Sequence, residues 1–309
     1  MSALSEKSIA LVGSAGACRN YRELLGEFPE LALEAVVGAG PSQGPTDSAR
    51  SFASIAEMLA AGCVPQLAVV CSPVRERARD AEALLRAGVD VLVEPPLAME
   101  PDEADRVTAL AERAGRIAST AAPFRSLPGL REASRLIERG RIGRLCAIEC
   151  DLSQKRERPE AGIWMESGPH AIDLVEALAG PAERIRMLSH SPLAPASEDS
   201  VLVEVEHCSQ LVSRISMTWL EERGAPIARC IGERGEILIG RAQTILRTED
   251  GSETVTDGLY SEREAYREVL RDFLAACRAS ERPIDHGVES VAWIRAAYRS
   301  LESKCWELS

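Results

Sequence analysis

The first 120 residues alternate short apolar runs, rich in β-branched side chains, with segments of helical periodicity. The runs are SIALV (8–12), LEAVV (33–37), LAVVCS (67–72), VDVLV (89–93) and RIAST (116–120), and helical patterns begin near Arg19, Ile55, Arg75 and Asp102. Apolar runs between helices indicate strands that are buried on both faces, and the handedness of crossover connections makes such a sheet parallel and doubly wound. The sequence therefore predicts an α/β domain of the Rossmann type, an architecture typical of nucleotide binding.

The pattern changes after Pro123. A helix over 130–140, a strand over 144–152 and a helix after Pro169 precede a series of strands between Arg184 and Arg247, and two long amphipathic helices follow near 261–279 and 288–303. Turn signals between the strands favour hairpins, and hairpins make a largely antiparallel, open sheet. We expect residues 1–121 to form the dinucleotide-binding domain and residues 122–309 an α+β domain for substrate binding and oligomerisation.

Composition excludes several classes of partner. Acidic residues outnumber basic ones by 48 to 36, so there is no broad cationic surface for nucleic acid. No apolar run approaches the roughly 20 residues that cross a bilayer, and the first residues do not resemble a signal peptide. Nine cysteines lack both a CxxC pair and a histidine at ligand spacing. We expect a cytoplasmic protein with buried thiols that binds no metal, membrane or nucleic acid.

The first strand runs into a turn where a dinucleotide-binding fold has the pattern G-x-G-x-x-G. Of the three glycines only Gly13 is kept, while Ala15 adds a methyl group near the expected pyrophosphate and Cys18 adds bulk between helix and strand. The backbone N–H groups at the start of the next helix would still face an anion. The candidate cofactor-binding residues of this turn are Gly13, Ser14, Ala15 and Gly16. The alternative is that no dinucleotide binds.

The second strand ends in Val37-Gly38-Ala39-Gly40-Pro41, without the acidic residue that normally binds the adenosine ribose. A missing carboxylate removes repulsion against a 2′-phosphate. The sequence therefore favours NADP slightly over NAD as the cofactor, with Ser42 or Arg50 as possible partners of the phosphate.

Two longer strings resemble the signatures of the Gfo/Idh/MocA oxidoreductases, and the resemblance covers nearly the whole chain. Residues 91–98, VLVEPPLA, are similar to V-x-x-E-K-P-L-A, and residues 162–174, GIWMESGPHAIDL, resemble G-x-x-x-D-x-G-x-H-x-x-D-L. Segments 127–144 and 287–291 also resemble the sequence patterns usual in this family. The resemblance implies a Rossmann domain carrying NAD or NADP, covered by an antiparallel-sheet domain, with a sugar, cyclitol or similar polyol bound between them. It also implies homo-oligomers, which we expect to form through the open sheet.

Carried over by position, the resemblance assigns proton chemistry to His170 and to the preceding acid, Glu166. It places Ser72 and Pro73 at the turn on the nicotinamide side and Glu94 in the cofactor site. Asp173 corresponds to the second acidic residue of the G-x-x-x-D-x-G-x-H-x-x-D-L signature. Beside them we place Trp164 and Pro95 at the substrate. Simpler roles stand next to these: His170 could be a packed helix residue, Asp173 could complement the helix dipole, and Trp164 could fill core. Arg77 stands where many members have histidine, and a solvated helical arginine explains it equally well.

Pro95 occupies the position of the family's lysine, and proline has neither a side-chain donor nor a backbone N–H. Three interpretations follow. His170, with an ordinary pKa near 6.5, could exchange the substrate proton alone. Lys155 could replace the missing amine, since Lys7 and Lys304 are the only other lysines and lie near the termini. Finally, redox chemistry could be altered toward imine reduction or lost, leaving a binding or assembly module or non-redox chemistry.

Overall fold

A computed structural model of the chain describes residues 7–38, 49–155, 157, 161–191, 197–224, 226–257, 261–279 and 287–308. The chain divides into two compact units, one within 1–121 and 266–288 and the other within 122–265 and 289–309. The boundary after residue 121 coincides with the expected one. Segment 266–288 differs, because it belongs with the N-terminal unit rather than with the domain that precedes it in sequence.

The N-terminal unit is built on a six-stranded sheet in which every pair of neighbours is parallel. Its order is β3 (Arg50–Phe52), β2 (Leu31–Val37), β1 (Lys7–Val12), β4 (Leu67–Val70), β5 (Asp90–Val93) and β6 (Ala118–Thr120). The strand order reverses beside β1, which is the doubly wound arrangement. The predicted Rossmann sheet is confirmed.

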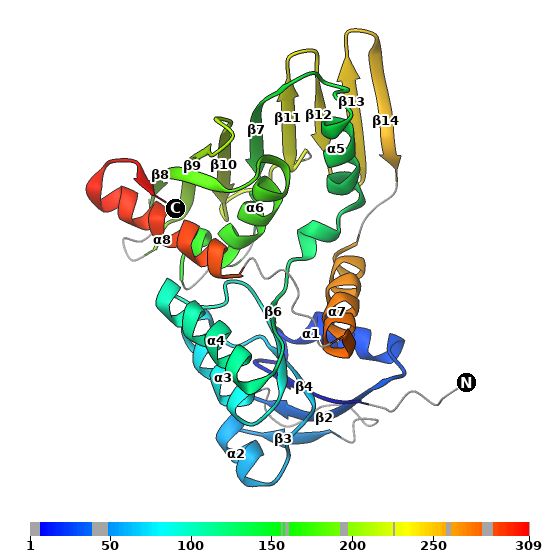
Figure 1. The fold of residues 1–309 in the computed structure, drawn as a ribbon, viewed down its shortest axis with the longest axis vertical. Helices are drawn as coiled ribbons and strands as arrows, with labels where there is room; N and C mark the ends of the chain where they lie inside the picture. The colour runs from blue at the N-terminus through cyan, green and yellow to red at the C-terminus, as the bar shows by residue number, and fades with distance from the viewer. Residues whose placement is uncertain are drawn as a thin grey trace. The chain divides into compact units, whose positions relative to one another are not determined.

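Helices cover both faces of this sheet. They are α1 (Arg19–Leu24), α2 (Ile55–Ala60), α3 (Val74–Arg86), α4 (Pro101–Ala114) and α7 (Glu262–Ala279). One core joins Leu11 and Val69 of the sheet to Tyr21 of α1 and to Leu270 and Phe273 of α7. Helices α3 and α4 lie side by side and contact each other as well as strands of the sheet (Figure 1). The apolar side of α7 therefore explains why segment 266–288 joins this unit.

The C-terminal unit is built on a nine-stranded sheet. Its order is β14 (Gly251–Asp257), β13 (Gln243–Thr248), β12 (Gly235–Ile239), β11 (Ala228–Gly232), β7 (Leu145–Asp151), β10 (Val212–Thr218), β9 (Ser200–His207), β8 (Ala182–His190) and β15 (Glu307–Leu308). Only β7 and β10 pair in parallel. The largely antiparallel sheet is thus confirmed, and it extends one hairpin strand beyond the expected end at Arg247.

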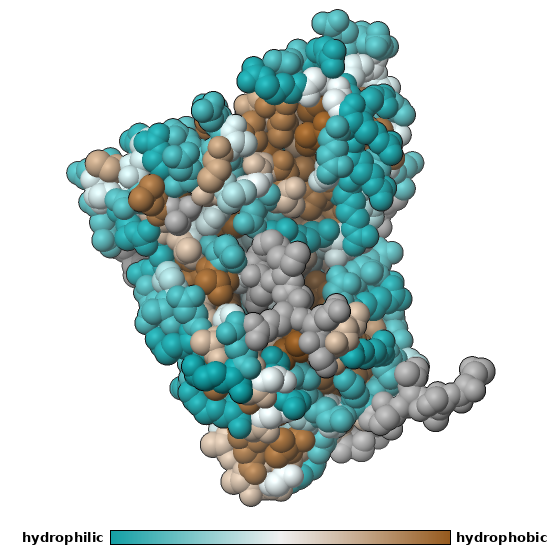
Figure 2. All heavy atoms as spheres, viewed as in Figure 1, coloured by the Kyte–Doolittle hydropathy of each residue, from teal (hydrophilic) through white to brown (hydrophobic). Residues whose placement is uncertain are grey.

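One face of this sheet carries the helices and the other is open. The 3₁₀ turn η2 (Pro123–Ser126) leads into α5 (Pro128–Glu138), α6 (Ile163–Ala179) contacts β7, β9 and β10, and α8 is the last helix (Gly287–Ser303). Along β9, Val201, Val203 and Val205 are buried while Leu202 faces solvent, which is the period of two expected for a half-buried strand. On the helix-bearing side, hydrophobic residues gather over β11 and β12 beside α5 (Figure 2).

Helix α6 begins at Ile163, so the expectation of a helix only after Pro169 is wrong, and Pro169 lies inside the helix. The reason is a cap supplied from elsewhere in the chain: the Trp164 N–H donates to Oε1 of the buried Glu198, over 2.9 Å. Gly162 precedes the helix with φ +94°, and a Cβ there would lie 2.4 Å from the same oxygen. A carboxylate at this end satisfies an otherwise unpaired N–H and complements the helix dipole.

The expectation of buried thiols is confirmed in part. Five of the nine free cysteines are buried, Cys277 is half-buried, and Cys146, Cys208 and Cys305 are exposed. Among the described residues, no helix is both long and apolar enough to cross a membrane.

His207 is expected to titrate below the usual histidine pKa of 6.5. It is fully buried, with Nδ1 2.9 Å from the Gly180 carbonyl oxygen and Nε2 2.8 Å from Ser213 Oγ. Since a carbonyl only accepts, Nδ1 carries the proton and Nε2 accepts from the hydroxyl. Burial lowers the pKa of His207 below its usual 6.5. The unfolded chain therefore binds this proton first, so the stabilising contribution is complete above about pH 6.5 and declines below it. An NMR titration of the ring checks this, and a midpoint at or above 6.5 would contradict it.

Candidate functional site

Gly13 begins the exposed turn that follows β1. Its φ of +138° lies in a region that favours glycine, and a Cβ at this position would be 2.7 Å from the Cys71 carbonyl oxygen. The Gly13 N–H donates to the Val37 carbonyl over 2.9 Å, which ties the turn to the end of β2. The backbone here has no room for any larger residue.

The turn is closed by its own backbone and is open toward solvent. The Ser14 carbonyl accepts from the Cys18 N–H over 3.0 Å, and Ser14 Oγ accepts from the Ala17 N–H over 3.2 Å. Residues 14–17 are exposed, and a Cβ on Gly16 would meet no atom within 4 Å. Cys18 is buried in the core, so its bulk is accommodated there. An exposed turn at the carboxyl end of the central strand fits the diphosphate of a dinucleotide, despite the loss of two motif glycines.

Ser72 and Pro73 follow β4, beside this turn. Ser72 is buried and its Oγ donates to Asp80 Oδ2 over 2.5 Å, while Pro73 is exposed at the start of α3. Arg77, one turn along α3, donates from Nε to the Ser72 carbonyl over 2.8 Å and from Nη1 to the carbonyls of Pro95 and Pro96 over 2.5 and 3.3 Å. Arg77 is therefore half-buried and joins the ends of β4 and β5, which neither sequence-based interpretation anticipated.

Glu94 follows β5 and is held by two tyrosines. Its Oε1 accepts from Tyr21 Oη over 2.6 Å and its Oε2 from Tyr266 Oη over 3.5 Å, and the two tyrosine rings meet edge to face with centroids 5.2 Å apart. Burial, and then the charge of Glu94, raise the pKa of Tyr21 well above its usual value. Tyr21 therefore remains a proton donor, and the carboxylate keeps its place at the carboxyl edge of the sheet.

Glu166, His170 and Asp173 lie on α6, in the C-terminal unit. Spacings of four and three residues place them on one side of the helix. Glu166 Oε1 accepts from the Ala161 N–H over 2.9 Å. His170 is half-buried, its Nδ1 is shielded from solvent, and its ring packs 5.4 Å from that of Phe124, measured between centroids. The imidazole is thus oriented by packing against a neighbouring turn.

Arg125 in η2 holds the far end of the same helical face. Its Nε lies 3.4 Å from Oδ1 of the buried Asp173, and its Nη2 lies 2.6 Å from Glu176 Oε2. Phe124 and Arg125 come from one turn that precedes α6 by about forty residues, and neither belongs to a motif that the sequence displays. The Asp173 carboxylate is therefore engaged by an arginine of its own unit, a structural role that the sequence did not indicate and that differs from both substrate contact and a helix-dipole charge.

Two further predicted site residues lie apart from this face. Trp164 is fully buried, and its Nε1 donates to the Ile294 carbonyl over 3.3 Å. A Cβ on Gly168 would lie 2.8 Å from the indole ring of Trp164, so only glycine at this position leaves room for the ring. The packing of Trp164 supports the alternative that it fills core rather than contacting substrate. Lys155 is exposed in the segment after β7. Ser42 lies outside the described residues.

Family models match both parts of the chain: the oxidoreductase family with an NAD-binding Rossmann fold over residues 7–122, and the Gfo/Idh/MocA C-terminal domain over residues 130–238. Inositol 2-dehydrogenase 2 of Saccharopolyspora erythraea is 26% identical over 235 residues, which are 69% of this chain and 66% of that protein, just under two thirds of its length.

Solved structures share the fold across almost the whole chain. An oxidoreductase from Agrobacterium radiobacter, in complex with NAD⁺, L-tartaric acid and magnesium, has a TM-score of 0.82 at 14% identity, covering 98% of both chains. The WlbA dehydrogenase from Chromobacterium violaceum, in complex with NADH and UDP-GlcNAcA, has a TM-score of 0.80 at 17% identity, covering 100% of this chain and 97% of that one. At these identities the likeness establishes the architecture alone.

Proposed function

The chain belongs to the Gfo/Idh/MocA oxidoreductase family, and on that premise we propose that it transfers a hydride between NAD(P) and a hydroxyl, carbonyl or imine carbon of a small polar metabolite such as a sugar or cyclitol. The observation that carries the proposal is the face of α6 on which His170 and Glu166 stand four residues apart at the signature positions. The inositol dehydrogenase relative supports a polyol as the substrate class.

The cofactor is held by the N-terminal unit in this proposal. Gly13, Ser14, Ala15 and Gly16 provide the turn for its diphosphate, and Ser72 and Pro73 stand at the neighbouring strand end. When bound, the dinucleotide supplies or accepts the hydride. We favour NADP, because β2 ends without an acidic residue at Gly38 and the exposed Arg50 begins the adjacent strand β3.

The proton is handled by His170. Imidazole is the side chain most often used in general acid–base catalysis, so we assign to His170 the exchange of the proton of the substrate oxygen or nitrogen. Glu166 Oε1 accepts a hydrogen bond from the Ala161 N–H. In this proposal the other carboxylate oxygen of Glu166 orients or assists the histidine. Pro95 has no proton to give, and its carbonyl is occupied by Arg77. Lys155 remains the alternative donor, as the exposed lysine of the segment after β7.

We also propose that the protein is a cytoplasmic homo-oligomer that assembles through the open sheet. On that face Leu188 and Leu202 are cross-strand partners, 55% and 39% exposed. Ion pairs flank them, joining Arg184 to Glu206 and Arg214 to Glu204. Apolar side chains within a polar rim are typical of protein interfaces. The second candidate function is a non-catalytic binding or assembly module, which the substitution of Pro95 for the family lysine favours.

Titration with NADPH and NADH, followed by nicotinamide fluorescence, tests the proposed function. We expect both to bind, NADPH the more tightly. The variant Arg50→Gln should weaken NADPH by about tenfold, since a charge-assisted contact is lost, and should leave NADH unchanged. Binding of neither dinucleotide would exclude hydride transfer and leave the binding module. Release of tightly bound cofactor on denaturation, without turnover, would instead indicate non-redox chemistry with an internally cycling cofactor.

A further inference from the structure

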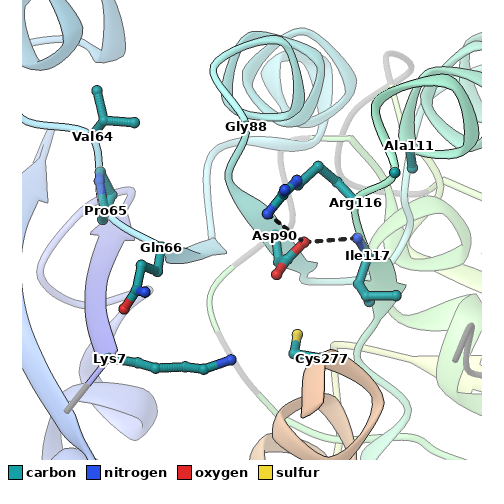
Figure 3. Close-up of a pocket in the computed structure, with 11 residues that line it drawn as sticks. Lys7, Val64, Pro65, Gln66, Gly88, Asp90, Ala111, Arg116, Ile117 and Cys277 are labelled. Carbon is teal, nitrogen blue, oxygen red and sulfur yellow. Dashed lines mark hydrogen bonds and ion pairs between the residues drawn. The ribbon is translucent and has the colours of Figure 1, made fainter. Parts of the chain in front are cut away.

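A polar cavity of about 550 Å³ opens at the amino-terminal edge of the parallel sheet (Figure 3). Its walls come from the start of β1, the residues just before β4 and β6, the start of β5, and the ends of α4 and α7. All of these belong to the N-terminal unit. The exposed turn at Gly13 follows the opposite end of β1, so the cavity is separate from the predicted cofactor site. Its volume lies within the range of small-molecule sites.

Two cations and one acid line this cavity. Lys7 extends across it, and the Asp90 carboxylate points into it (Figure 3). Asp90 Oδ1 already accepts the Ile117 N–H over 2.9 Å, and Arg116 Nη1 stands 3.9 Å from the same oxygen, beyond hydrogen-bond distance. The acid is therefore partly satisfied by backbone, and it does not neutralise both cations.

Both cations keep donors to spare. The Nε atom of Arg116 is buried and has no hydrogen-bond partner among the residues that the structure describes. No ion pair or side-chain hydrogen bond joins Lys7 to any other residue of the described ranges. A buried donor without a partner costs free energy unless something accepts from it. The cavity thus brings the positive charges of Lys7 and Arg116 together against the single carboxylate of Asp90.

The half-buried thiol of Cys277 closes the cavity from α7. Burial, and then the neighbouring Asp90, raise the pKa of this thiol to about 12. A thiol that stays protonated at neutral pH is a poor nucleophile. The arrangement is therefore suited to reversible binding rather than to covalent chemistry.

We propose that this cavity is a second binding site, for a small anionic metabolite whose carboxylate or phosphate group lies between Lys7 and Arg116. Binding uses the ammonium and the guanidinium as charge-assisted donors, with Asp90 limiting the affinity by repulsion. The site is independent of hydride transfer, because none of its residues belongs to the turn at Gly13 or to α6.

Isothermal titration of the whole protein with inorganic phosphate, and separately with succinate, tests the proposal. Lys7→Gln and Arg116→Gln are each expected to weaken binding of the preferred anion by about tenfold, whereas Lys304→Gln, which removes the same charge from an exposed site, leaves it unchanged. A preference for phosphate or for succinate identifies the anionic group. Absence of binding for both probes, or equal weakening in all three variants, would overturn the proposal.

Asp90→Asn distinguishes binding from damage to the fold. The amide oxygen can still accept the Ile117 N–H, but the repulsive charge is gone. We expect binding of the preferred anion to strengthen about threefold or more, a direction that loss of structure does not produce. Thermal unfolding verifies that the variant is folded, and if phosphate and succinate bind it no more tightly than they bind the unchanged protein, the proposed site is wrong.

Discussion

Replacing His170 with alanine is expected to lower kcat by about a hundredfold or more, while the affinity for NADPH stays nearly the same. The large effect on turnover follows because general acid–base catalysis by a positioned imidazole contributes about 10² to 10⁴ to a rate. The unchanged affinity follows because the residues that we propose for the cofactor belong to the other unit. Steady-state kinetics and fluorescence titration measure the two quantities, and full activity in the variant would remove His170 from the mechanism.

The same experiment separates His170 from Lys155. Lys155→Met should leave kcat unchanged if the imidazole exchanges the proton alone, and should lower it as strongly as His170→Ala if the amine replaces the lysine missing at Pro95. Lys155 is exposed, so its substitution carries little risk to the fold. Phe124→Leu keeps an apolar side chain beside the imidazole but removes the ring that packs 5.4 Å away. It serves as the control for orientation, since it should change kcat far less than losing the imidazole.

Gly13→Ala is expected to lower the stability of the N-terminal unit more than any other substitution that adds a single methyl group. The added Cβ would lie 2.7 Å from the Cys71 carbonyl oxygen, and φ of +138° is a conformation that alanine rarely adopts. We expect the free energy of unfolding to fall by about 2–4 kcal/mol, as backbone strain adds to a steric clash. Urea denaturation measures this change. NADPH binding should be lost even under conditions where circular dichroism shows the variant folded, because the turn must move.

Gly26→Ala is the matched control for this prediction. A Cβ on Gly26 would meet no atom within 4 Å, and its φ lies outside the left-handed region. Its stability should change by less than about 1 kcal/mol, or rise slightly, because alanine reduces the freedom of the unfolded chain. If both variants unfold at the same urea concentration as the unchanged protein, the close approach of Gly13 to Cys71 does not affect the free energy of unfolding.

Much of the fold could be predicted because its causes are local in sequence. Apolar runs such as 67–72 and 89–93 lie between helical patterns, and the handedness of crossovers leaves few ways to arrange them. The alternating strands after Arg184 likewise predict a half-buried antiparallel sheet. The helix start was misplaced because Glu198, 34 residues beyond Trp164, provides its cap. Segment 266–288 was misassigned because an amphipathic pattern shows that a helix has an apolar face but not which core receives it.

The candidate site divides in the same way. Sequence alone was enough to propose Gly13, Glu94, Glu166 and His170 as candidates, because the motifs they resemble have particular residue types at fixed spacing. Only the tertiary structure showed that Tyr21 and Tyr266 hold Glu94 and that Arg125 holds Asp173. These partners are separated from the motifs by 48 to 172 residues. Such contacts depend on how distant elements pack, and no local pattern of residues encodes that packing.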